Sequence, residues 1–247
     1  MTEASATNRV GFMGRGGLPP VWCVDEVMYC RILIWEGVCS PFSRCQPIRL
    51  MATATSTLKF TVGQYDRMIA AGVFEQPALP FAADLSRVEL IEGEIVMMSP
   101  IGARHEEVVD RLTAWSFRCL PDSSVRVRIQ QSLGIPGQHS VPQPDIAWVQ
   151  PKDYAAHRPE AADAILVIEV AETSLHFDLG AKALMYARGG VAECWVVDVN
   201  AEVVHLLSAP GPDGYGVKRV AGRGEAVAAN GRPEATLEVE SLFRPRP

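Results

Sequence analysis

Two apolar stretches decide the fold of this chain: PQPDIAWV at residues 142–149 and AILVIEVA at residues 164–171. The second is a continuous apolar run, which is typical of a strand covered on both faces. Each stretch contains one acidic residue, Asp145 in the first and Glu169 in the second. Burying a carboxylate costs several kcal/mol unless it is paired, hydrogen-bonded or bound to metal. These two acids are therefore the first candidates for a functional site.

The segments on either side predict helices and further strands. An apolar face recurs along residues 102–119, which predicts a helix, and a second helix is expected from Leu175 to Arg188, ending at Gly189. Shorter elements are expected as a helix capped by Thr61, a strand pair within 87–100, strands within 124–135 and 193–199, and hairpins from 202 onward. This order predicts an α/β fold, with a mixed central sheet flanked by helices and extra β-hairpins.

Composition describes a globular protein. The chain has 247 residues, 48% of them apolar, and a formal net charge of −6 from 23 basic and 29 acidic side chains. No apolar run reaches the roughly 18 residues that a membrane span needs, and the N-terminus lacks the pattern of a signal peptide. We therefore expect a cytoplasmic protein that does not cross a membrane. The acidic balance disfavours non-specific coating of nucleic acid but does not exclude a local basic groove.

The composition changes near residue 50. Residues 1–50 contain four of the six cysteines, at spacings that match neither a zinc site nor a redox pair. We expect these residues to be a poorly ordered extension or a mis-assigned start, and residues 51–247 to form a single domain. That domain would carry a net charge of −7, because the first 50 residues hold five basic and four acidic side chains.

Lys182 is the third charged residue that interrupts an apolar pattern. It lies on the inward face of the helix expected from Leu175, where an ammonium group needs an anion such as Asp145 or Glu169. Two carboxylates and a lysine suit a Mg²⁺ or Mn²⁺ site for phosphodiester hydrolysis, because hard cations prefer oxygen ligands and activate water. Lys182 would position that water or help to deprotonate it, since burial depresses a lysine pKa. A purely structural Lys–Glu pair, or an Asp178–Lys182 pair, is equally open.

Four motifs in the same order resemble the Uma-type restriction endonuclease family of the PD-(D/E)XK nuclease-like superfamily. They are RVELIEGEIVMMSP (87–100) followed by RH, then PQPDIAWV, LVIEVAETS, and D-x-x-x-K-x-x-x-Y from Asp178. The resemblance covers roughly residues 57–220. It implies a restriction-endonuclease-like fold, DNA as substrate, and Asp145 and Glu169 as metal ligands. The superfamily's usual lysine is replaced here by Ala171, and the resemblance implies that Lys182 takes its role.

Some polar residues near these motifs have two readings each. His105 faces inward on the first predicted helix, where it would position water or contact a phosphate; alternatively, it is a hydrogen-bonded histidine at a helix start. Glu89 and Glu94 match the family's hairpin motif, and we expect them to serve packing or the hairpin. Gln130 and Gln131 end a strand beside the expected site, where one of them could hydrogen-bond a metal-coordinated water.

An arginine stripe is the candidate for holding a polyanion. Arg104, Arg111 and Arg118 recur every seven residues along one flank of the predicted helix, and Arg126 and Arg128 alternate along the next strand. Phosphate contacts need only such a local stripe. The alternative is an ordinary solvated helix flank.

The leading hypothesis is a divalent-metal-dependent endonuclease that hydrolyses DNA phosphodiester bonds. The alternative from another class is a catalytically silent nuclease-like module that binds DNA or assists assembly in a mobile element. A third reading is a metal-dependent hydrolase of RNA or small phosphoesters. By analogy with nucleases that cut both strands, the apolar C-terminal strands could pair in a homodimer.

Overall fold

The computed structural model describes residues 57–74, 87–98, 100–120 and 124–244. The chain divides into two units, residues 1–53 and 54–247. The extension expected over residues 1–50 lies outside the described residues, so this expectation and the single domain from residue 51 stay predictions. In the described part of the second unit, no helix is long and apolar enough to span a membrane.

A six-stranded mixed sheet forms the centre of the second unit, in the order β3-β4-β5-β6-β7-β8. The strands are β3 (Arg126–Ile129), β4 (Ile146–Val149), β5 (Ala164–Ala171), β6 (Glu193–Asp198), β7 (Val203–Gly211) and β8 (Gly214–Ala221). All neighbours are antiparallel except β5 and β6, which are parallel. The predicted mixed sheet is therefore confirmed. One predicted hairpin, β7–β8, extends this sheet, because β7 pairs along the whole of β6.

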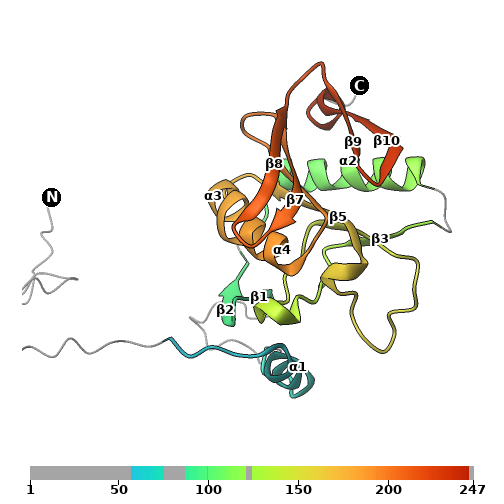
Figure 1. Cartoon of the computed structure of the whole chain (residues 1–247). Helices are drawn as coiled ribbons and strands as arrows, with labels where there is room; N and C mark the ends of the chain where they lie inside the picture. The colour runs from blue at the N-terminus through green and yellow to red at the C-terminus, as the bar shows by residue number, and fades with distance from the viewer. Residues whose placement is uncertain (1–56, 75–86, 99, 121–123, 245–247) are drawn as a thin grey trace, which may run out of the picture. The chain divides into compact units, whose positions relative to one another are not determined.

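Two helical layers cover the two faces of the sheet (Figure 1). Helix α2 (Ala103–Cys119) packs Leu112 and Trp115 against Ile146 and Trp148 on one face. The other face is covered by α3 (Leu175–Phe177), η3 (Asp178–Lys182) and α4 (Ala183–Gly189), which run on from one another. These residues form the two long helices that the sequence predicts, with a π-helical segment inside the second.

The remaining elements are short. They are α1 (Val62–Ala70), β1 (Val88–Ile91), β2 (Glu94–Met97), η1 (Pro136–Gln138), η2 (Ala161–Asp163), β9 (Ala226–Ala229), β10 (Arg232–Glu238) and η4 (Val239–Leu242). Thr61 caps α1 as predicted, in a reciprocal capping box with Gln64. The hairpins β1–β2 and β9–β10 are separate two-stranded sheets.

Strand β3 is shorter than its sequence pattern suggests. The alternating stretch of residues 124–135 predicts one long strand, whereas the strand ends at Ile129. Gln130 adopts a positive φ of 49°, and a left-handed residue turns the backbone out of the strand direction. This turn leaves the Gln130 side chain beside Asp145, with Nε2 3.2 Å from Oδ1.

Candidate active site

Strand alternation places Asp145 and Glu169 on the same face of the sheet. In the antiparallel pair β4–β5, Ile146 lies opposite Ile168, so the positions just before and just after them also face each other. Successive side chains point to opposite faces, and the two carboxylates therefore leave the sheet on the side covered by α4. Both residues are buried. The structure thus brings together the two acids that the sequence singles out.

Lys182 completes this group from the helical layer. Its Nζ lies 3.2 Å from Glu169 Oε1 and 3.2 Å from Glu89 Oε1, and only 5% of the residue is exposed. One turn further along, the Tyr186 hydroxyl donates to Glu169 Oε1 over 2.6 Å. The structural Lys–Glu pair considered from the sequence is thus present. Among the described residues, Lys182 makes no ion pair with Asp178, which instead accepts a hydrogen bond from Ser174 Oγ at 2.5 Å.

Glu89 lies in the hairpin, as expected, and also makes a contact that the sequence does not predict. It belongs to β1, is 3% exposed, and accepts a hydrogen bond from the Gln143 amide at 2.6 Å as well as contacting Lys182. The expected packing role overlooks this contact, because 93 residues separate Glu89 from Lys182 in the sequence. A signal did exist. Glu89 interrupts the apolar stretch VELI just as Glu169 interrupts ILVIEV.

Asp145 is held in one orientation by three nitrogen atoms. The Val170 amide donates to Oδ2 over 2.8 Å, and His105 Nε2 lies 3.0 Å from Oδ1. Gln130 Nε2 donates to the same Oδ1 at 3.2 Å. A carboxylate with this many partners cannot rotate freely, so its oxygens present a fixed geometry. His105, in the first turn of α2, therefore contacts Asp145, a candidate metal ligand.

The charges in this group shift its proton equilibria. Burial, together with the nearby Asp178, Asp145 and Glu89, raises the pKa of Glu169 from its ordinary 4.5 to about 8, although the Lys182 charge opposes the rise. Burial alone would lower the pKa of Lys182, but Glu169 and Glu89 outweigh it and raise that pKa. The depressed lysine pKa expected from the sequence is therefore wrong. Lys182 therefore favours its protonated form, which suits positioning or charge stabilisation better than action as a general base.

The same balance acts on His105. Burial would lower its pKa, but the hydrogen bond and charge of Asp145, with smaller contributions from Glu172 and Asp178, raise it above the ordinary value. The imidazole therefore favours its protonated form while Asp145 is ionised. A cationic His105 would attract a phosphate.

A cavity of about 560 Å³ opens over these residues. Its polar lining includes Glu89, His105, Asp145, Glu169, Glu172, Asp178 and Lys182. Its apolar wall comes from β2, the segment before α2, and α3, with Val96, Met97, Met98, Ile101 and Phe177. Four buried carboxylates thus share one pocket with three basic groups, Lys182, His105 and Arg87, so oxygen ligands for a cation are gathered there.

The predicted arginine stripe is only partly available on the surface. Arg104 donates to the Val199 carbonyl at 2.8 Å and to Asn200 Oδ1 at 3.1 Å. Arg111 pairs with Glu107 at 2.7 Å and donates to the carbonyls of Ser241 and Arg244, which ties α2 to the C-terminal segment. Arg118 is exposed. The role of the three in binding nucleic acid stays a prediction.

Comparison with known proteins identifies the family of the chain. The family described as "Uma2: Putative restriction endonuclease" matches residues 74–240, which is more than half of the chain. The chain belongs to the Uma2 family. The predicted family is thereby confirmed. No curated protein sequence matches the chain.

A solved structure shows the same fold. The Uma2 chain is similar to a protein from Anabaena variabilis described as "a putative nuclease belonging to DUF820", with 16% sequence identity and a TM-score of 0.52. The similarity covers 69% of the Uma2 chain and 94% of the other. At this identity the match concerns the fold alone. Together with the six-stranded mixed sheet, it confirms the predicted restriction-endonuclease-like architecture.

Proposed function

We propose that this Uma2 protein is a divalent-metal-dependent endonuclease that hydrolyses DNA phosphodiester bonds. The observation that supports this most directly is the convergence of Asp145, Glu169 and Lys182 on one cavity. The three come from two strands and a helical segment, and they lie in the motifs by which the sequence resembles the family. A purely structural ion pair would not need an open cavity above it.

The donor set fits a hard divalent cation. Asp145 and Glu169 offer carboxylate oxygens, and both hydrogen bonds that Glu169 accepts from described residues end on Oε1, which leaves Oε2 for another ligand. In the described part of the chain, no three His, Cys, Asp or Glu side chains group closely enough to hold a metal by themselves. Mg²⁺ commonly binds through one or two carboxylates, with water and substrate phosphate completing its shell. These residues therefore suit Mg²⁺ or Mn²⁺ better than a structural zinc.

Each residue of the candidate site would then have a definite role. A divalent cation held by Asp145 and Glu169 would supply Lewis acidity, lowering the pKa of the attacking water and offsetting charge on the phosphate. Lys182, which stays protonated, would position that water or stabilise charge on the phosphate. Glu89 and Tyr186 orient Lys182 and Glu169, and His105 and Gln130 orient Asp145.

Nicking of supercoiled plasmid DNA tests the proposal. Purified wild type should nick with Mg²⁺ or Mn²⁺ and stop when EDTA is added. Asp145→Asn, Glu169→Gln and Lys182→Met should each lose about two to four orders of magnitude in rate, which is the scale of removing a group that acts only in the transition state. Glu94→Gln, which changes an exposed carboxylate on β2, is the matched control and should retain the rate.

Two outcomes would contradict the proposal. Nicking that persists in Asp145→Asn would place the activity elsewhere or in a contaminant. Failure of the wild type to nick with any divalent metal would favour the silent nuclease-like module instead. Parallel assays on RNA and on bis-p-nitrophenyl phosphate separate DNA cleavage from hydrolysis of RNA or small phosphoesters.

A further inference from the structure

Two arginines on the edge strand β3 share a face of the sheet with Asp145. Strand β3 pairs with β4 so that Arg126 lies opposite Val149 and Arg128 lies opposite Ala147. Paired residues of neighbouring strands point to the same side, and positions two apart along a strand do so as well. Asp145 precedes Ala147 by two, so the candidate metal site and both arginines emerge from one face.

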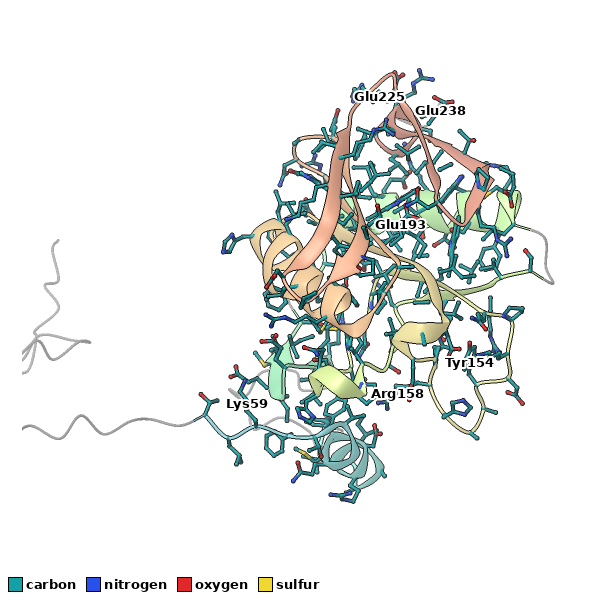
Figure 2. The ribbon with its side chains drawn as sticks, in the orientation of Figure 1. Lys59, Tyr154, Arg158, Glu193, Glu225 and Glu238 are labelled. Carbon is teal, nitrogen blue, oxygen red and sulfur yellow. The ribbon has the colours of Figure 1, made fainter. Side chains whose placement is uncertain are left out.

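Tyr154 holds the two guanidinium groups in place. Its ring packs against Ala147 and Val149, and the Cζ atoms of Arg126 and Arg128 lie 5.8 Å and 5.9 Å from the ring centroid. The loop that carries Tyr154 joins β4 to β5, beside the sheet edge (Figure 2). Cation–π contact orients a guanidinium but does not neutralise its charge. The arginines are therefore positioned while their charge remains available to an anion.

Neither arginine pairs with a carboxylate among the described residues. Within the described part of the chain, Arg126 donates to the Lys152 carbonyl at 3.1 Å, and the buried Nε of Arg128 has no hydrogen-bond partner. Asp163, whose charge helps to raise the pKa of Tyr154, is itself paired with Lys152 at 2.6 Å. Burial and the charge of Arg126 lower the pKa of Arg128. Two cations fixed side by side without an acidic partner are a natural place for a phosphate.

The distance to the candidate metal site suits one nucleic acid strand. Gln130, which touches Asp145, follows Arg128 by two residues, and two residues of strand span about 7 Å. Along one strand of a duplex, phosphates follow one another at about 3.4 Å of axis. Because successive phosphates lie further apart in space than this axial rise, the arginines lie within a few nucleotides of a phosphate at Asp145.

We propose that Arg126 and Arg128, held by Tyr154, bind backbone phosphates of the nucleic acid strand that the site cuts. This inference rests on the proposed nuclease function and adds the surface that holds its substrate. It places phosphate contacts on the β3 edge, whereas Arg111 of α2 is paired with Glu107.

The test measures DNA binding in EDTA, where hydrolysis is prevented, by fluorescence anisotropy of a labelled 30-base-pair duplex from 50 to 200 mM salt. Replacing two phosphate contacts should lower the slope of log K against log salt by about two. We expect this for the Arg126→Gln/Arg128→Gln protein, with at least about tenfold weaker binding at 50 mM salt. Arg126→Gln alone, at an exposed position, should give about half of the slope change. Arg128→Lys alone, which keeps the charge, should retain most of the wild-type binding.

Lys218→Gln is the matched control, because Lys218 is an exposed cation on β8, the opposite edge strand. It should bind DNA like the wild type. If the double variant also binds like the wild type while the wild type binds and nicks DNA, the inference fails and the nuclease proposal stands. If the wild type neither binds nor nicks DNA, the proposed function fails, and the inference fails with it. Thermal melts of all variants identify any loss of binding that comes from unfolding.

Discussion

The protonation of Glu169 depends on the residues that surround it. In the unfolded chain its carboxyl group would titrate near 4.5, whereas in the folded protein its pKa is raised to about 8. Burial removes water from the anion, and this cost, together with repulsion from neighbouring acids, outweighs the attraction of Lys182. A bound divalent cation would replace the proton as the source of positive charge. The cost of ionising buried Glu169 is therefore measurable in the metal-free protein.

The first prediction concerns the pH dependence of stability without metal. Below pH 4.5, Glu169 is protonated in both states. From there to about pH 8 the unfolded chain releases this proton while the folded protein keeps it, so stability falls as pH rises, by several kcal/mol in total. Glu169→Gln removes the titrating group and should flatten this fall. Urea unfolding in EDTA at pH 5, 6.5 and 8 measures it, with Glu94→Gln as the control. A slope unchanged in Glu169→Gln would contradict the raised pKa.

The second prediction concerns Tyr186, whose buried hydroxyl donates to Glu169 at 2.6 Å. Tyr186→Phe leaves the ring in place but deprives a buried acceptor of its donor, which costs about 1–3 kcal/mol. Urea unfolding should show this loss at pH 7. Because Glu169 also loses one of its two restraints, nicking should slow as well. A variant as stable as the wild type would show that the hydroxyl contributes nothing net.

At the scale of elements, the segment from α3 through η3 to α4 determines where Lys182 lies. A π-helical stretch covers Asp178–Lys182, and such stretches occur frequently at functional sites. The helix then ends at Gly190, whose φ of +85° provides the left-handed cap that glycine adopts without strain. One turn of π-helix changes the direction in which following side chains point. Lys182, the last residue of this segment, and Tyr186, about one turn later, both contact Glu169.

The third prediction compares two glycines of this segment. A Cβ on Gly189 would lie 2.4 Å from Cγ2 of Ile135, a core residue, whereas a Cβ on Gly180 would meet nothing within 4 Å. Gly189→Ala should therefore destabilise the protein by about 1–3 kcal/mol. Gly180→Ala should be neutral or stabilise it by up to about 1 kcal/mol. Differential scanning calorimetry of the two variants tests the contrast, and equal melting temperatures would refute it.

At the scale of the whole molecule, metal binding should couple to folding. Four carboxylates buried in one pocket disfavour the metal-free folded state, and a cation that binds only the folded state stabilises it by mass action, about 2.7 kcal/mol at a hundredfold excess over Kd. The fourth prediction is that Mg²⁺ or Mn²⁺ raises the melting temperature of the wild type. Asp145→Asn/Glu169→Gln should show no such rise. A rise of equal size in this variant would place the metal at another site.

The fifth prediction concerns the first part of the chain. The described elements and the family match both lie after residue 53. A chain that begins at Met51 should therefore unfold at the same urea midpoint as the full chain and nick DNA at the same rate. An insoluble or unfolded product would show that residues 1–50 contribute to the folded domain. Sedimentation of both proteins would also measure the predicted homodimer.

Local patterns were sufficient for most of the fold. Apolar runs and period-two alternation predict the strands, and the apolar faces predict both long helices, because these patterns reflect geometry that acts over a few residues. The same reasoning predicts the boundary of β3 badly. Gln130 turns out of the strand to meet Asp145, a residue 15 positions away, and no local pattern carries that contact.

The sequence by itself determined which acids are out of place in apolar strands, and hence that Asp145 and Glu169 need partners. Only the tertiary structure decided which residues those partners are. Glu89 reaches Lys182 from a hairpin far away in the chain, and it helps to raise a lysine pKa that burial alone would lower. Such a balance depends on how many charges the fold gathers around one atom, and spacing along a helix or strand does not record that number.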